Sequence, residues 1–160
     1  MTAKLKIVII DDHPLFREGI KTIIARDRRF EVVDEAGNGR EGLEKAVNLK
    51  PDVAVVDISL PDTTGLEVAR KIRLQCPHTR VMILSMHSKI DYIVEAFQAG
   101  ATGYVVKESA TERLVQALGS VAAGEYYLDS SISQEVVAKL MQSPVKEAKV
   151  SDSGYGKLSS

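Results

Sequence analysis

The chain has 160 residues, of which 44% are hydrophobic, so it can build one ordinary domain with a real core. Its formal net charge of -1 provides no global positive field, which argues against a DNA-binding domain. The single cysteine, Cys76, excludes an internal disulfide, and no signal-like or long apolar segment occurs. We therefore expect a cytoplasmic protein that has no membrane partner.

Short apolar runs alternate with helical patterns along most of the chain. Runs of β-branched residues bounded by turn residues predict buried strands at 5–10, 30–36, 53–57, 80–84 and 102–106. Apolar residues with a period of 3.6 predict a helix opening at His13–Pro14 and further helices at 40–48, 65–74, 90–98 and 110–123. This alternation predicts an α/β fold, a doubly wound five-stranded parallel sheet with helices on both faces.

Two segments follow this predicted domain, which we place at 1–124. The segment 125–142 contains a predicted amphipathic helix from Ile132 to Met141. Residues 143–160 are rich in Ser, Lys and Gly, which is typical of a flexible linker. Because no apolar run follows this linker, we expect that the domain it leads to is missing.

Polar side chains stand where four of the predicted strands end. Asp11 and Asp12 follow the first strand, Asp57 closes the third, Ser85 follows the fourth and Lys107 the fifth. The carboxyl ends of parallel strands lie along one edge of a sheet, which is where open α/β sheets bind ligands. In the flavodoxin-like strand order 2-1-3-4-5, the first and third strands are neighbours, so Asp11 and Asp12 are expected beside Asp57.

This grouping predicts phosphoryl-transfer chemistry. Each residue alone has an ordinary alternative role, as a helix cap, a loop hydroxyl or a solvated strand end. Three neighbouring carboxylates repel one another unless a cation intervenes, and oxygen ligands with room for water suit Mg²⁺. The cation would let Asp57 attack phosphorus and form an acyl phosphate. Lys107 could then pair with one phosphoryl oxygen, and the Ser85 hydroxyl could donate to another.

Several motifs resemble the receiver domain of two-component response regulators, over residues 4 to about 124. They are Ile10–Pro14 (IDDHP), Asp57–Pro61 (DISLP) with Gly65, Leu84–Ser85, and Tyr104–Lys107 (YVVK). Other stretches are similar to the NarL/FixJ subgroup, whose output is a LuxR-type helix-turn-helix: His13–Pro14, Met86–His87, Lys107–Ser109 and Gly124–Leu128. The last residues, Lys157–Ser160, resemble the start of such an output domain.

The resemblance implies a role for each site residue. Asp57 would be the phosphoacceptor, supplied by a sensor histidine kinase. Asp12 and Asp57 would contact Mg²⁺ directly, Asp11 would act largely through water, and Ser59 would offer its backbone carbonyl.

Two further residues, Ser85 and Tyr104, would form the switch pair. The phosphoryl group would draw in the Ser85 hydroxyl, and the Tyr104 ring would follow. Many receivers carry Pro after the position of Lys107, with a cis bond before it, whereas this chain has Glu108, which leaves that isomer open.

The function implied is phosphorelay signal transduction that regulates transcription. The chain would bind DNA through the missing output domain and not through this fragment, and phosphorylation could drive a homodimer. It would assist only its own phosphorylation and dephosphorylation, and would not otherwise be an enzyme.

Three alternatives stay open. A phosphohydrolase similar to the haloacid dehalogenases would need a second Asp two residues after the nucleophile, where this chain has Ser59, and a cap domain. A flavin- or nucleotide-binding domain would need a phosphate loop after the first strand, where Asp11 and Asp12 would repel phosphate. A receiver that has lost phosphorylation would act by protein contacts alone, which the complete acidic set argues against.

Overall fold

The computed structural model describes residues 3–128 and 138–139, and its first compact unit ends at Leu128. The strands are β1 (Leu5–Ile10), β2 (Phe30–Ala36), β3 (Val53–Asp57), β4 (Arg80–Ser85) and β5 (Gly103–Val106). The helices are α1 (Pro14–Ala25), α2 (Gly39–Leu49), α3 (Gly65–Gln75), α4 (Ile90–Gln98) and α5 (Ala110–Ala122), with one 3-10 turn, η1 (Lys107–Ser109).

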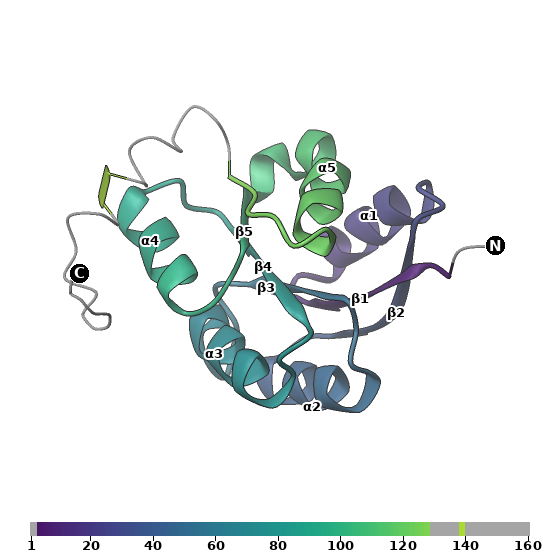
Figure 1. The fold of residues 1–160 in the computed structure, drawn as a ribbon, viewed down its shortest axis with the longest axis horizontal. Coiled ribbons are helices and arrows are strands. Elements are labelled where there is room, and N and C mark those ends of the chain that lie inside the picture. The colour runs from purple at the N-terminus through teal and green to yellow at the C-terminus, as the bar shows by residue number, and fades with distance from the viewer. Residues whose placement is uncertain (1–2, 129–137, 140–160) are drawn as a thin grey trace. The chain divides into compact units, whose positions relative to one another are not determined.

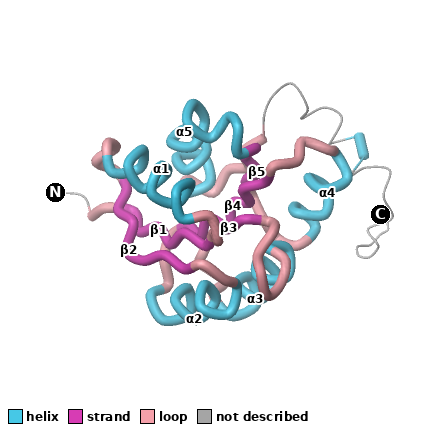
Figure 2. Tube along the Cα trace, turned by 180° about the vertical axis from the view of Figure 1, so that it is seen from behind, coloured by secondary structure: helices cyan, strands magenta, loops and turns pink. Residues whose placement is uncertain are grey.

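The strands form one parallel sheet in the order β2-β1-β3-β4-β5, which confirms the predicted fold class and strand order. Helices α1 and α5 pack together on one face, and α2, α3 and α4 cover the other (Figures 1 and 2). From β1 the chain continues to β2 on one side, and from β3 it continues to β4 and β5 on the other side. The topological switch point of the sheet, where ligands bind in such folds, therefore lies between β1 and β3.

The centre of the sheet is apolar on both faces. Every residue of β3 is buried, as are Ile7, Val8, Ile9 and Ile10 of β1. Strands buried on both faces need apolar side chains at every position, which is why their sequences read as continuous β-branched runs. In β3, and in β1 beyond Lys6, the next polar side chain therefore comes at the carboxyl end of the strand.

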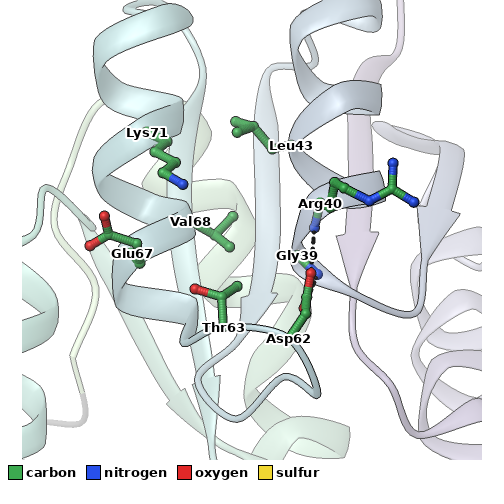
Figure 3. Close-up of a pocket in the computed structure, with 8 residues that line it drawn as sticks. All are labelled: Gly39, Arg40, Leu43, Asp62, Thr63, Glu67, Val68 and Lys71. Atoms are coloured by element: carbon green, nitrogen blue, oxygen red, sulfur yellow. Dashed lines mark hydrogen bonds between the residues drawn. The ribbon is translucent and has the colours of Figure 1, made fainter.

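The loop after β3 is tied to the start of α2. Asn38 caps α2 by accepting a hydrogen bond from the Glu41 amide at 2.8 Å. Asp62, which lies in the β3–α3 loop, accepts from the amides of Gly39 at 2.8 Å and Arg40 at 3.0 Å (Figure 3). One exposed carboxylate therefore joins the β3–α3 loop to the start of α2 at the carboxyl edge of the sheet.

The segment after α5 returns to the sheet, which no pattern in the sequence predicts. The Tyr127 amide donates to the Thr102 carbonyl at 2.9 Å, and the Tyr104 amide donates to the Tyr127 carbonyl at 3.2 Å. This parallel bridge brings the Tyr127 side chain into the core, where it is 8% exposed. Tyr127 therefore covers part of the open edge of β5.

The remaining predictions for the C-terminal part lie largely outside the described residues. Of the helix predicted at 132–141, only Ala138 and Lys139 are described, and both are helical. The predicted linker at 143–160 lies outside the described residues. Among the helices that the structure does describe, none has the length and apolar character needed to cross a membrane.

Candidate functional site

Asp57 lies at the carboxyl end of β3, and its side chain is almost completely buried. Its Oδ1 accepts a hydrogen bond from the Ser59 amide at 3.1 Å, and its Oδ2 accepts one from Lys107 Nζ at 2.9 Å. Burial raises the pKa of Asp57, the bonds from Lys107 and Ser59 oppose that shift, and the charge of Asp11 adds to it. The carboxylate is therefore held in place but poorly solvated.

Asp11 and Asp12 sit beside Asp57, as predicted, because Ile10 of β1 pairs with Val56 of β3. Asp11 is fully buried, and its Oδ2 lies 2.9 Å from Lys107 Nζ as an ion pair. That contact is not aligned as a hydrogen bond. Asp11 Oδ2 and Asp12 Oδ1 are both buried atoms that have no hydrogen-bond partner within the described residues. Such oxygens are costly unless another group satisfies them.

Lys107 extends from η1 into the middle of this cluster. Its ammonium lies 2.9 Å from both Asp57 Oδ2 and Asp11 Oδ2 and 4.5 Å from the centre of the Phe16 ring. The side chain is largely buried, so its charge is balanced chiefly by the two carboxylates. The peptide bond between Lys107 and Glu108 is trans, as are the other described bonds.

His13 joins the cluster and is missing from the predicted site residues. Its Nδ1 lies 3.0 Å from Asp11 Oδ1, 3.2 Å from Asp12 Oδ1 and 3.4 Å from Asp57 Oδ2. One ligand atom from each of these four side chains lies within 4.8 Å of all the others, so the cluster could bind a metal. The available signal was the position of His13 directly after the two aspartates.

The predicted switch residues meet beside the cluster, on β4 and β5. Ser85 is fully buried, and its Oγ accepts a hydrogen bond from the His87 amide at 2.9 Å. The Tyr104 ring points inward, and its hydroxyl donates to the His87 carbonyl at 2.8 Å. Burial raises the pKa of Tyr104, and a hydrogen bond with Ser85 opposes that shift. Both hydroxyl groups therefore contact the start of the β4–α4 loop.

The β3–α3 loop packs tightly against the end of β3. A side chain on Gly65 would place its Cβ only 2.3 Å from the Asp57 carbonyl oxygen. Ser59, in the same loop, reaches the cluster through its amide, while the use of its carbonyl as a ligand stays a prediction. The glycine thus lets α3 begin in close contact with the backbone of Asp57.

A separate hollow lies between α2 and α3 (Figure 3). It has a volume of about 350 Å³ and is lined by Gly39, Arg40, Leu43, Asp62, Thr63, Glu67, Val68 and Lys71. None of the predicted site residues lines this hollow, and its lining contains both basic and acidic side chains. The site chemistry is therefore at the carboxylate cluster and not in this cavity.

Comparisons with known proteins agree on a family. The response regulator receiver domain family matches residues 7–119. The transcriptional regulatory protein DegU of Brevibacillus brevis is 37% identical over 134 residues, which are 84% of this chain and 57% of DegU. The nitrate/nitrite response regulator protein NarL of Escherichia coli strain K12 is also 37% identical over 134 residues, covering 84% of this chain and 62% of NarL.

A solved structure matches as well. The crystal structure of a LuxR-family two-component response regulator from Aurantimonas sp. SI85-9A1 aligns with a TM-score of 0.80 and 35% identity. The alignment covers 88% of this chain and all of that one. The chain spans less than two thirds of the length of DegU and NarL. On the extent of these matches, the chain belongs to the response regulator receiver domain family.

Proposed function

We propose that this chain is the receiver part of a two-component response regulator in which Asp57 accepts a phosphoryl group from a sensor histidine kinase. Phosphorylation would then control a DNA-binding, transcription-regulating output domain outside this chain. The observation that supports this most is the buried Asp57 carboxylate, bonded to Lys107 and flanked by two aspartates. Each of these has a buried oxygen that makes no hydrogen bond among the described residues.

The transfer follows from the chemistry of a carboxylate and a phosphorylated histidine. An Asp57 oxygen attacks phosphorus and forms an O–P bond while the N–P bond of the donor breaks, and the imidazole leaves with its electron pair. Lys107, already 2.9 Å from Asp57 Oδ2, can pair with a phosphoryl oxygen as charge builds up. The product is an acyl phosphate on Asp57.

The residues present fit a divalent cation. Asp11 Oδ2 and Asp12 Oδ1 lack hydrogen bonds among the described residues, and hard oxygen donors are what Mg²⁺ prefers. Asp12 and Asp57 would hold Mg²⁺ directly, with the Ser59 carbonyl, and Asp11 would act through water. The bound ion supplies positive charge that offsets the repulsion between the attacking carboxylate and the phosphoryl group.

The response would begin at Ser85 and Tyr104. The Ser85 hydroxyl would leave its contact at the β4–α4 loop to donate to the phosphoryl group, and the inward Tyr104 ring would occupy the space beside it. The contacts of both residues with His87 support this, because one movement would shift the loop that leads into α4.

Other parts of this proposal rest on the family. The chain would work in the cytoplasm, would catalyse only its own phosphorylation and dephosphorylation, and would form a homodimer when phosphorylated. DegU is named a transcriptional regulatory protein, which supports an output that acts on transcription.

The test is the intact mass of the protein after incubation with Mg²⁺ and acetyl phosphate. We expect the wild type and an Asp62→Ala control to gain one phosphoryl group, because Asp62 bonds to the first two amides of α2 and lies outside the cluster. The Asp57→Ala variant should gain none. A gain in Asp57→Ala would show that Asp57 is not the acceptor, and no gain in a wild type that binds Mg²⁺ would favour a receiver acting by contacts alone.

A further inference from the structure

His13 occupies the N-cap position of α1 but does not use its side chain for capping. Its backbone is extended, with φ of -98° and ψ of 99°, and Pro14 begins the helix. The His13 amide donates to Asp11 Oδ1 at 2.8 Å, which fixes the backbone beside the acidic pair. The imidazole is thereby held at the carboxylates, with its side chain 57% exposed.

The spacing around the imidazole matches that of ligands sharing one ion. Neighbouring ligands of an octahedral ion with bonds of about 2.1 Å lie about 3 Å apart. His13 Nδ1 lies 3.0, 3.2 and 3.4 Å from one oxygen each of Asp11, Asp12 and Asp57. The contact with Asp11 is a hydrogen bond between His13 Nδ1 and Asp11 Oδ1 in the absence of an ion. An ion that replaced it would bind the ring nitrogen in its deprotonated form, at ligand spacing from all three carboxylates.

Two other observations point to an ion on this side of the cluster. Lys107 Nζ lies 3.1 Å from His13 Nδ1 but makes its ion pairs with the Oδ2 atoms of Asp11 and Asp57. Asp12 Oδ1, which faces the imidazole, is buried and has no hydrogen-bond partner among the described residues. The ammonium thus leaves a carboxylate oxygen of Asp12 without a hydrogen bond next to the imidazole nitrogen.

We propose that His13 is a nitrogen ligand of the metal site and makes that site selective for first-row transition ions such as Mn²⁺ and Zn²⁺ over Mg²⁺. The inference rests on the metal site of the proposed function and adds a ligand to it. Imidazole suits transition ions, whereas Mg²⁺ prefers oxygen and retains water. Loss of His13 should therefore weaken transition-ion binding and leave Mg²⁺ binding nearly unchanged.

The direct test is pulsed electron paramagnetic resonance of bound Mn²⁺, which detects an imidazole nitrogen through its ¹⁴N modulation. We expect this modulation in the wild type and its loss in both His13→Ala and His13→Gln. His78→Ala is the matched control, because His78 is exposed and lies between α3 and β4, at the opposite end of the strands. It should retain the modulation.

Calorimetry of the same proteins measures selectivity without phosphorylation. His13→Ala should bind Zn²⁺ about tenfold more weakly than wild type and Mg²⁺ within about twofold. Wild-type Mn²⁺ binding that depends on Asp57 but shows no ¹⁴N modulation would overturn the role of His13 and leave the proposed function standing, as would modulation that survives in His13→Ala. Failure of both Mg²⁺ and Mn²⁺ to bind would overturn the metal site as well.

Discussion

At the scale of single residues, Asp57 is an ionisable carboxyl in a buried position, where its charged form is poorly solvated. Burial raises its pKa above the usual value near 3.8, so the folded protein binds a proton there more tightly than the unfolded chain does. The free energy of unfolding therefore falls as pH rises from the pKa of Asp57 in the unfolded chain through its raised pKa in the folded protein. The Asp57 carboxylate is therefore kept at a cost to stability, which is common at functional sites.

Replacing that carboxylate should stabilise the protein when no divalent ion is present. In EDTA at pH 7, Asp57→Asn should unfold at a higher urea midpoint than wild type, because the buried charge is gone while Lys107 keeps its ion pair with Asp11. The advantage should shrink as pH falls toward 4, where Asp57 takes up a proton. Urea unfolding at the two pH values measures both effects.

Asp62 provides the control for this prediction, because its pKa is shifted in the direction opposite to that of Asp57. Hydrogen bonds from the Gly39 and Arg40 amides lower the pKa of Asp62. Asp62 therefore stabilises the folded protein above the pKa it has in the unfolded chain, and this stabilisation is lost as pH falls through its lower pKa in the folded protein. Asp62→Asn should therefore have a lower urea midpoint than wild type at pH 7. Stabilisation by both substitutions, or by neither, would contradict this account of the site.

At the scale of elements, the junction between β3 and α3 depends on one close approach. A Cβ at Gly65 would meet the Asp57 carbonyl oxygen at 2.3 Å and the Ile58 Cα at 2.8 Å, and neither backbone atom can move away without shifting Asp57. Gly65→Ala should therefore destabilise the protein by about 2–4 kcal/mol in urea unfolding. It should also reduce phosphoryl incorporation from acetyl phosphate.

A glycine in another helix provides the comparison. Gly19 lies on the exposed side of α1, and a Cβ there would have no atom within 4 Å. Gly19→Ala should stabilise the protein by about 0.5–1 kcal/mol, because alanine has the better helix propensity. Equal changes in the free energy of unfolding for Gly65→Ala and Gly19→Ala would show that the fold tolerates a Cβ at Gly65, despite the close approach of the Asp57 backbone.

At the scale of the whole molecule, the sheet is completed by a residue that follows the last helix. Tyr127 is buried and makes backbone hydrogen bonds with residues 102 and 104 at the edge of β5. Tyr127→Ala should lower the free energy of unfolding by about 3 kcal/mol through loss of a buried aromatic ring. Its neighbour Tyr126 is 73% exposed, so Tyr126→Ala should change the free energy of unfolding by less than about 1 kcal/mol.

The outcome of this pair would also define the folded unit. A large loss for Tyr127→Ala would mean that the segment after α5 belongs to the sheet energetically as well as geometrically. Equal, small effects of the two substitutions would mean that the domain is already stable without that segment, and would favour the boundary predicted at residue 124.

The sequence by itself determined the layers and the place of the chemistry. Strands such as Val53–Asp57 are recognisable because burial on both faces requires an unbroken apolar run, and the strand order then brings Asp11 and Asp12 beside Asp57. The grouping of Lys107 with these carboxylates follows from the same rule, since all parallel strands end at one edge.

Only the tertiary structure decided how individual side chains are used. Neither the direction of the His13 ring nor the pairing of Tyr127 with β5 is carried by a periodic pattern. The His13 ring contacts Asp57 and Lys107 as well as its neighbours in sequence, and Tyr127 pairs with a strand more than 20 residues before it. The inward position of Tyr104 depends likewise on the His87 carbonyl in the loop after the neighbouring strand β4. Local patterns specify where a strand ends, whereas long-range contacts select which donor and which acceptor meet there.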